Sequence, residues 1–248
     1  MRYFIYFSFN GKLYHGWQKQ KNSITVQEKI EEALSVLLKD KIEVTGAGRT
    51  DTGVHAKEMA AHFDVNKHFE NSNNFIFKLN QFLSNDIYIK SLKSVKNNAH
   101  ARFDAFSRTY EYHISKEKDV FSNEYSYYLN YSLNNTRINE AIKIILNNKD
   151  FKCFTKSKTD VTNYLCNILD SKWIEYDKKH VFEITANRFL RNMVRSIVGT
   201  LIDVGLEKKT INDFRNIIMS KNRSMAGYSV PAKGLFLKRI NYPKEIFI

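Results

Sequence analysis

Residues 46–56 have the sequence Gly46-Ala47-Gly48-Arg49-Thr50-Asp51-Thr52-Gly53-Val54-His55-Ala56. The three glycines in this stretch predict backbone that turns tightly or that another group approaches closely. Apolar residues predict a strand over 42–45, and apolar/polar alternation predicts another over 58–65. We therefore expect a loop between two strands, with the carboxylate of Asp51 at the rim of a sheet.

Two nucleotide-binding motifs do not fit this loop. A dinucleotide-binding fingerprint needs glycine where Asp51 stands, and a phosphate-binding Walker loop needs Gly-Lys-Ser/Thr. A helix should follow either motif, whereas a strand is predicted here. One interpretation of Asp51 is that it caps its own turn, the commonest role of Asp among glycines. The other is that Asp51 is a nucleophile or base, with the Arg49 cation nearby.

Composition predicts a packed, basic protein. The chain has 248 residues, 43% hydrophobic and 14% aromatic, enough for one large domain or two smaller halves and too apolar for a disordered chain. Its 39 Lys and Arg against 26 Asp and Glu give a net charge of +13. This charge indicates a polyanionic partner, with nucleic acid the first candidate. The alternative is a composition rich in Lys and Asn throughout, without such a partner.

The compartment and cofactor requirements follow from what the sequence lacks. No apolar run reaches transmembrane length, and the first residues have no signal-peptide layout, so we expect a cytoplasmic protein without a membrane partner. Cys153 and Cys166 form no C-x-x-C pair and are too few for a disulfide framework. The His and Cys residues show no metal-ligand spacing, so we expect neither a metal nor another cofactor.

Hydrophobic periodicity predicts an α+β fold with the order β-α-β-β-α-β twice. We expect two ferredoxin-like halves, 1–104 with the loop and 105–248, which share a mainly antiparallel sheet with helices on one side. The active-site cleft would lie between the halves. In the first half the predicted elements are a strand at 3–8, a helix at 25–40 opened by a Thr25–Glu28 capping box, strands at 42–45 and 58–65, a helix at 73–83 and a strand from 87. In the second they are a strand at 109–114, a helix at 138–146, strands at 168–176 and 180–185, a helix at 189–204, a short helix capped by Thr210 and a strand from 235.

The predicted helix over 189–204 begins with two arginines. Arg191 and Arg195 are four residues apart and would share a face. Cations at a helix start oppose its dipole, which suggests that an anion lies there, although a solvated basic face is the alternative. A partly enclosed, ionised Asp51 needs such a cation, because burial alone would raise its pKa. Tyr110 and Tyr112 lie on one face of an alternating strand and are expected in the core on pattern alone.

The motifs resemble those of the tRNA pseudouridine synthase A family. Residues 46–56 closely resemble its signature loop, whose common form has Ala at the position of Thr52. A second motif is similar over Asn187-Arg188-Phe189-Leu190-Arg191-Asn192-Met193-Val194-Arg195-Ser196-Ile197-Val198-Gly199, and a third, R-x-Y-x-Y, over Arg108-Thr109-Tyr110-Glu111-Tyr112. Shorter segments at 16–18, 25–27, 101–103 and 234–237 also match, so the resemblance spans nearly the whole chain.

The resemblance implies an isomerase that converts uridine to pseudouridine at positions 38, 39 and 40 of the tRNA anticodon stem-loop. It implies that Asp51 is the nucleophile, that Arg195 pairs with it, and that Tyr110 packs against the target base. We expect Arg49 and Arg191 to bind the substrate. It also implies a homodimer with the RNA lying across both subunits. The alternatives are a non-catalytic RNA-binding protein and a pseudouridine synthase that acts on other RNAs.

Overall fold

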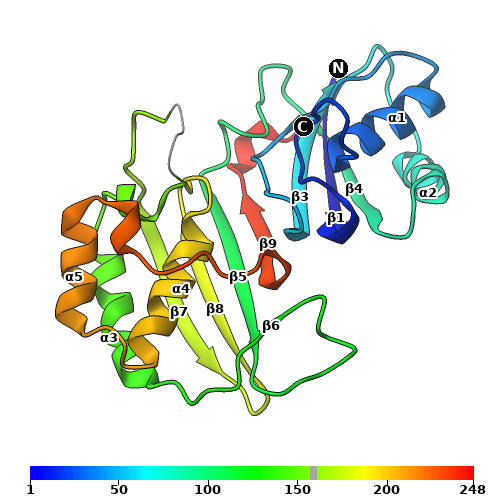
Figure 1. The fold of residues 1–248 in the computed structure, drawn as a ribbon. Coiled ribbons are helices and arrows are strands. Elements are labelled where there is room, and N and C mark those ends of the chain that lie inside the picture. The colour runs from blue at the N-terminus through cyan, green and yellow to red at the C-terminus, as the bar shows by residue number, and fades with distance from the viewer. Residues whose placement is uncertain (157–160) are drawn as a thin grey trace. The chain divides into compact units, whose positions relative to one another are not determined.

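The computed structural model describes residues 1–156 and 161–248, and the chain divides into two compact units. Unit 1 consists of residues 1–108 and 236–248, and unit 2 of residues 109–235. Figure 1 shows the elements of each unit along the chain. The predicted domain boundary between residues 104 and 105 stays a prediction.

Unit 1 is built around the central strand β1. Its elements are β1 (Arg2–Phe9), α1 (Val26–Leu38), β2 (Thr45–Gly46), β3 (His55–Asp64), α2 (Ser72–Phe82) and β4 (Ile87–Val95). β1 lies between β3 and β4 and pairs antiparallel with both. Apolar residues on both faces of the strand predicted at 3–8 indicate such an interior position, which is confirmed. β9 (Leu235–Asn241) returns late in the chain and pairs in parallel with β3, with His55 opposite Phe236.

The two faces of β1 contact different parts of unit 1. Phe7 stacks on Trp17 at 5.4 Å between ring centroids, and the Trp17 carbonyl accepts a hydrogen bond from the Gln27 amide in the first turn of α1. On the other face, Phe4 meets Tyr242 edge to face at 5.0 Å. From the sequence alone, Trp17 is expected to anchor the core, and its exposed fraction of 1% confirms this. Figure 1 shows α1 and α2 together on one side of β1, β3 and β4.

Unit 2 combines a hairpin with three helices. Its elements are β5 (Ser107–Ser115), which starts in the last residues of unit 1, β6 (Tyr127–Tyr128), α3 (Asn135–Leu146), β7 (Ile168–Glu175), β8 (Lys179–Ala186), α4 (Met193–Gly205) and α5 (Ile211–Ser220). β7 and β8 pair antiparallel, with Trp173 opposite Phe182. The helices lie together beside this hairpin (Figure 1). The predicted inward residues of α4 are all buried, namely Met193, Ile197, Val198, Leu201 and Ile202.

The start predicted for the helix over 189–204 is wrong, because α4 begins at Met193. Asn192 has a φ of +66°, a left-handed conformation that cannot continue a right-handed helix. Arg191 therefore precedes the helix, while Arg195 lies in its first turn. The prediction that these two arginines share one helix face is also wrong.

The strand predicted over 42–45 is wrong except at Thr45, because the observed strand β2 comprises only Thr45–Gly46. Just before it, the backbone of Val44 bonds to side chains of α1: its N–H donates to Glu31 at 3.1 Å, and its carbonyl accepts from Gln27 at 3.0 Å. These side chains occupy the groups that a strand partner would use. The apolar periodicity of the helix predicted at 73–83 places Phe82 on its inward face, but Phe82 is 45% exposed, so that expectation is wrong.

Side-chain capping is confirmed at two predicted helix starts. Thr25 accepts from the Glu28 amide at 3.4 Å, but the reciprocal half of the predicted capping box is absent among the described residues. At α5 both halves are present: Thr210 Oγ1 accepts from the Asp213 amide at 3.1 Å, and the Asp213 carboxylate accepts from the Thr210 amide at 2.8 Å. Both threonines satisfy amides that a helix start would otherwise leave unbonded.

The fold class is confirmed at the level of a mixed α and β protein with mainly antiparallel strands. The described residues contain nine strands and five α-helices, with parallel pairing at β3–β9 and β5–β6. The ferredoxin-like arrangement of two halves stays a prediction. Across the described residues, every helix is too short or too polar to cross a membrane. In the same residues, His, Cys, Asp and Glu form no group that could hold a metal ion.

Candidate active site

The signature loop of unit 1, residues 46–56, is hydrogen-bonded to the segment over residues 11–18. The Trp17 amide donates to the Thr50 carbonyl at 3.3 Å, and the Gly53 amide donates to the Tyr14 carbonyl at 3.4 Å. These two bonds flank Asp51, whose side chain stays partly accessible. The Val54 amide closes the turn by donating to the Asp51 carbonyl at 3.1 Å. The loop therefore presents a carboxylate from backbone that is held on both sides.

Close packing explains two glycines, Gly16 beside the loop and Gly46 within it. Gly16 has a φ of +87°, and a Cβ there would lie 2.3 Å from the Thr50 carbonyl oxygen. At Gly46 a Cβ would lie 2.4 Å from Trp17 Nε1. Gly48, by contrast, has open space around it. Of the two reasons predicted for the loop glycines, a tight turn or a close approach, the close approach is confirmed at Gly46 and does not apply at Gly48.

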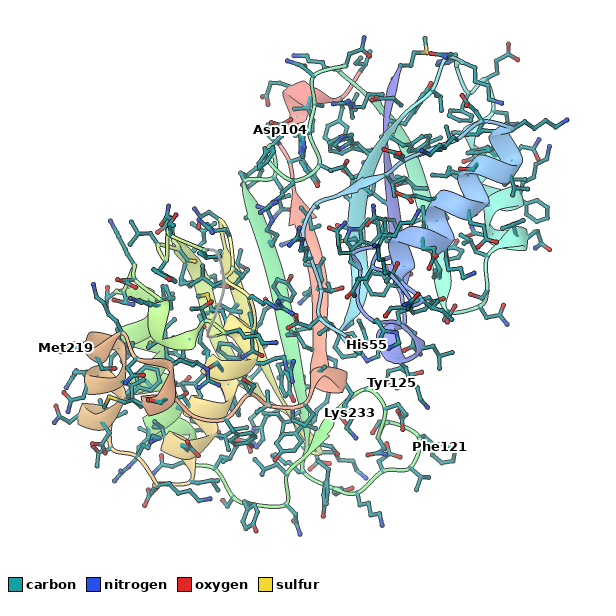
Figure 2. The ribbon with its side chains drawn as sticks, turned by 45° about the horizontal axis from the view of Figure 1, so that its top comes forward. His55, Asp104, Phe121, Tyr125, Met219 and Lys233 are labelled. Carbon is teal, nitrogen blue, oxygen red and sulfur yellow. The ribbon has the colours of Figure 1, made fainter. Side chains whose placement is uncertain are left out.

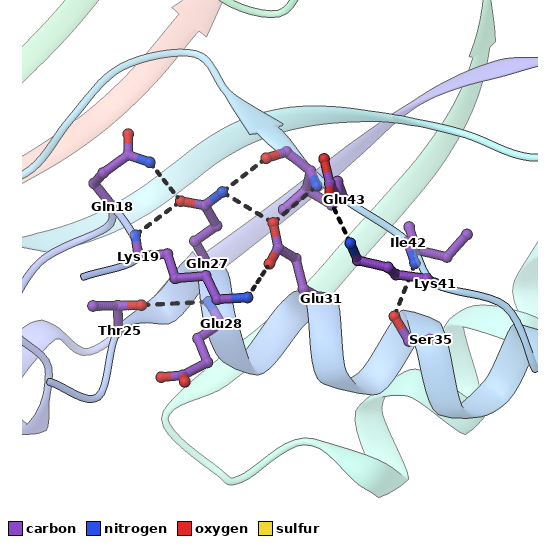
Figure 3. Close-up of polar contacts among 11 residues, drawn as sticks. Gln18, Lys19, Thr25, Gln27, Glu28, Glu31, Ser35, Lys41, Ile42 and Glu43 are labelled. Carbon is purple, nitrogen blue, oxygen red and sulfur yellow. Dashed lines mark hydrogen bonds and ion pairs between the residues drawn. The ribbon is translucent and has the colours of Figure 1, made fainter. Parts of the chain in front are cut away.

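A chain of side-chain amides orients Arg49. Arg49 Nε donates to Gln18 Oε1 at 3.3 Å, and Gln18 Nε2 donates to Gln27 Oε1 at 3.0 Å. Gln27 is anchored in turn, because its Nε2 donates to Glu31 Oε1 and to the Val44 carbonyl, each at 3.0 Å (Figure 3). Gln18 and Gln27 lie in motif segments quoted above, but nothing in their spacing identifies this positioning role.

His55 ends the loop and begins β3, where Figure 2 labels it. It is 2% exposed, and its ring stacks on Phe236 with centroids 4.8 Å apart. Its Nδ1 accepts from the Gly11 amide at 3.1 Å, so Nδ1 carries no proton in this arrangement. His55 thus fixes the far end of the loop to β9 and to the segment after β1.

A guanidinium supports the near end of the loop. Arg108 Nη2 donates to the Ala47 carbonyl at 3.2 Å, and its Nη1 donates to the Ala105 carbonyl at 2.8 Å. Arg108 is the first residue of the R-x-Y-x-Y segment, and no separate role was predicted for it. We assign it the positioning of the backbone next to Gly48.

In unit 2, Arg195 is held at the start of α4. Its Nε donates to the Val230 carbonyl at 2.7 Å, and the Val230 amide donates to the Arg195 carbonyl at 3.3 Å. Asn192 Nδ2 reinforces this connection by donating to Ser229 Oγ at 2.6 Å. The guanidinium of Arg195 is therefore oriented by the segment over 226–231. Arg191 is exposed, and its carbonyl accepts from the Lys156 amide at 3.0 Å.

The two tyrosines of β5 have different environments. Tyr112 is fully buried, and its hydroxyl donates to the Pro231 carbonyl at 2.8 Å; burial raises its pKa well above the usual value. The core position expected for Tyr112 is confirmed. Tyr110 is half-buried, with its ring edge-on to Phe189 at 5.0 Å. A half-exposed ring supported by another aromatic is suited to stacking on a base.

The candidate residues are thus divided between the two units. Asp51 and Arg49 belong to unit 1, whereas Tyr110, Arg191 and Arg195 belong to unit 2. Unit 1 supplies a carboxylate on firmly held backbone, and unit 2 supplies an oriented guanidinium and an aromatic ring. A carboxylate can act as a nucleophile, a guanidinium can pair with an anion, and an aromatic ring can stack on a base.

Comparison with known proteins agrees with these motifs. The sequence model of the family described as tRNA pseudouridine synthase matches residues 5–104 and 141–243. The tRNA pseudouridine synthase A of Parabacteroides distasonis is 47% identical over 246 residues, covering 99% of this chain and 98% of the relative. The protein of that name from Bacteroides fragilis is 46% identical over 247 residues, covering 99% of this chain and 98% of the relative. The protein of that name from Clostridium acetobutylicum is 39% identical over 236 residues, covering 94% of this chain and 96% of the relative. On both grounds, the chain belongs to the tRNA pseudouridine synthase family.

Proposed function

We propose that this chain isomerises uridines 38, 39 and 40 in the anticodon stem-loop of tRNA, with Asp51 as the nucleophile. Family membership supports the coarser statement, which is that the chain is an isomerase that converts uridine in tRNA to pseudouridine. The observation that carries the proposal for Asp51 is its accessible carboxylate in a turn that Tyr14 and Trp17 hold from both sides.

The reaction rearranges one nucleotide without any other reactant. The bond from ribose C1′ to uracil N1 breaks, and a bond from C1′ to C5 forms. C5 loses a proton and N1 gains one, so atoms and electrons balance within the nucleotide. Asp51 attacks ribose C1′ or uracil C6, the uracil detaches and turns, and its carbon rejoins the sugar. Because the balance is internal, we propose that no cofactor or metal takes part.

The remaining candidates have roles that follow from their chemistry. The target base must leave the stack before its glycosidic bond is reachable, and we assign Tyr110 to stack on the extruded uracil. We assign Arg195 to pair with the Asp51 carboxylate, because a neighbouring cation keeps a partly enclosed carboxylate ionised. Arg49 and Arg191 bind the substrate phosphates. We further propose that two chains act as a homodimer across one RNA, and that they act in the cytoplasm.

The test of this proposal is the incubation of the protein with unmodified tRNA transcripts carrying uridine at 38, 39 or 40, followed by mapping of pseudouridine. Wild type should form product at these positions, and Asp51→Asn should form none while still binding tRNA. The matched control is Asp177→Asn, which removes an exposed carboxylate between β7 and β8 and should keep full activity.

The other outcomes identify which part of the proposal is wrong. Product at other positions would overturn the anticodon assignment. Product that persists in Asp51→Asn would overturn the nucleophile. Wild type that binds tRNA without forming any product would leave an RNA-binding protein.

A further inference from the structure

A basic hollow lies on the face of the unit 1 strands that is turned away from the helices. Along β1, Tyr3 packs edge to face on Phe69 at 4.9 Å, and Phe69 stacks on Phe75 of α2 at 4.5 Å. Tyr6 points to the opposite face, where it meets Tyr242 edge to face at 6.4 Å. The hollow opens on this second face and has a volume of about 230 Å³.

Cations dominate the rim of this hollow. Lys90, Lys93 and Arg239 line it together with a single carboxylate, Glu58. In the part of the chain that the structure describes, none of these three cations is paired with a carboxylate. On α1, by contrast, Lys29 pairs with Glu32 at 2.9 Å. The hollow therefore presents three positive charges and one negative charge to a ligand.

Two register shifts in the strand pairing lie beside charged residues that line the hollow. The register of β1 with β4 shifts between Tyr6 and Phe7, which leaves Lys90 as the extra residue of a bulge. The register of β1 with β3 shifts between Phe7 and Phe9, beside Glu58. Bulges of this kind redirect side chains and are frequent beside functional sites. Lys90 Nζ joins the two bulged strands by donating to the Lys57 carbonyl at 2.6 Å.

Aromatic rings hold one of the cations in position. Lys93 Nζ lies 5.2 Å from the ring centroid of Tyr6 and 5.3 Å from that of Phe247. Cation–π contacts on two rings fix the ammonium group without cancelling its charge. The charge therefore remains available for an anionic ligand.

We propose that this hollow binds one phosphate and the adjoining ribose of the tRNA, outside the target nucleotide. The inference rests on the proposed function for the identity of the ligand. Its volume is below the roughly 300–1,000 Å³ of small-molecule pockets, which suits a phosphate and a sugar more than a whole ligand. The Glu58 carboxylate can accept a hydrogen bond from a ribose 2′-hydroxyl, a group that DNA lacks.

Affinity for tRNA measured at several salt concentrations tests this proposal. The tRNA carries cytidine at 38, 39 and 40, so binding is read without turnover. Lys90→Gln, Lys93→Gln and Arg239→Gln should each weaken binding about 3- to 10-fold and lower the slope of log affinity against log salt by about one. Glu58→Gln should strengthen binding, because it removes the negative charge while its amide oxygen can still accept from the 2′-hydroxyl. Lys93→Arg keeps the positive charge and should bind like wild type.

Lys78→Gln is the matched control, because Lys78 is an exposed cation on α2, on the helix side of the same unit. If the three hollow variants change affinity and slope no more than Lys78→Gln, the inference is wrong. The inference is also wrong if the hollow variants lose affinity only when thermal unfolding shows that they have lost structure. Inorganic phosphate or uridine 5′-monophosphate is then added at concentrations that leave total tRNA binding intact. If either competitor removes the difference in affinity between wild type and the variants, the hollow binds a free anion and not the tRNA. A wild type without pseudouridine activity would overturn the proposed function but would leave these binding results unaffected.

Discussion

At the scale of single residues, Gly46 shows how tightly the signature loop is packed. A Cβ there would lie 2.4 Å from Trp17 Nε1, and Trp17 is buried and stacked on Phe7. We expect Gly46→Ala to lower the free energy of unfolding by about 1–3 kcal/mol, as overpacking of a rigid core does. Urea denaturation measures this change.

Gly48 provides the control within the same loop. No atom outside its neighbours lies within 4 Å of a Cβ at this position, and its φ is not in the left-handed region. Gly48→Ala should leave the free energy of unfolding unchanged, or raise it by up to about 1 kcal/mol because alanine restricts the unfolded chain. Equal destabilisation by both substitutions would contradict the packing argument.

Gly46 and Gly48 cannot be distinguished from the sequence, because the motif shows their spacing but not the atoms that surround them in the fold. What distinguishes them is Trp17, which reaches Gly46 only through the fold. The same limit applies to Gln18 and Gln27, whose hydrogen bonds orient Arg49. Asp51 could be singled out as a candidate from the sequence because its position in the motif is itself the signal.

At the scale of elements, His62 connects β3 to the segment that follows β4. Its Nδ1 accepts from the Ala101 amide at 3.1 Å, and its ring meets His100 edge to face at 4.7 Å. The same segment is closed by Asp104, labelled in Figure 2, whose carboxylate accepts from the His100 amide at 2.7 Å. Burial, aided by the charges of Arg2 and His100, lowers the pKa of His62 to about 4.

This pKa predicts loss of stability in mild acid. Between pH 6.5 and 4 the unfolded chain takes up a proton at His62 that the folded chain does not, so stability falls as the pH is lowered. Above pH 6.5 the residue contributes no slope. The shift from 6.5 to about 4 corresponds to roughly 3 kcal/mol, measurable by urea denaturation at a series of pH values.

A substitution separates this contribution from other acidic and basic groups. His62→Asn keeps a hydrogen-bond acceptor near the Ala101 amide and should flatten the slope between pH 6.5 and 4. His15→Asn, at an exposed position, should keep the wild-type slope. An unchanged slope in His62→Asn would assign the acid sensitivity to other groups.

Element boundaries were predicted less well than element types. The helix over 189–204 was expected from the apolar periodicity after Met193, and that periodicity is buried as predicted. Its first turn was misplaced because nothing in the pattern shows that Asn192 adopts a left-handed conformation. The strand over 42–45 failed for a tertiary reason, since Gln27 and Glu31 take the backbone bonds of Val44.

At the scale of the whole molecule, the two cysteines report on unit 2. Both are buried, and burial raises the pKa of Cys153 to about 12 and that of Cys166 to about 11. The thiolate is the reactive form, so the native protein should resist a thiol reagent at pH 8 while the chain unfolded in guanidinium reacts at both positions. Cys153→Ser and Cys166→Ser assign the two signals. Rapid labelling of the native protein would contradict the burial of these side chains.

The contacts of the final strand could not be read from the sequence. Periodicity along the chain follows neighbours in sequence, so the final strand was assigned to the second half. In the structure its residues from Phe236 onward belong to unit 1, where Phe236 pairs with His55. Sequence spacing also carries no information on the distance between Asp51 and Arg195, which lie in different units.

The grouping of segments has a consequence for biosynthesis. Unit 2 is continuous, whereas unit 1 needs residues 236–248 to supply its parallel partner for β3 and the contact of Phe247 with Val95. A ribosome releases the chain from its N-terminus, so all of unit 2 emerges before these residues do. The later-encoded unit can therefore close first, while the nascent loop that carries Asp51 still lacks the support that residues 236–248 provide.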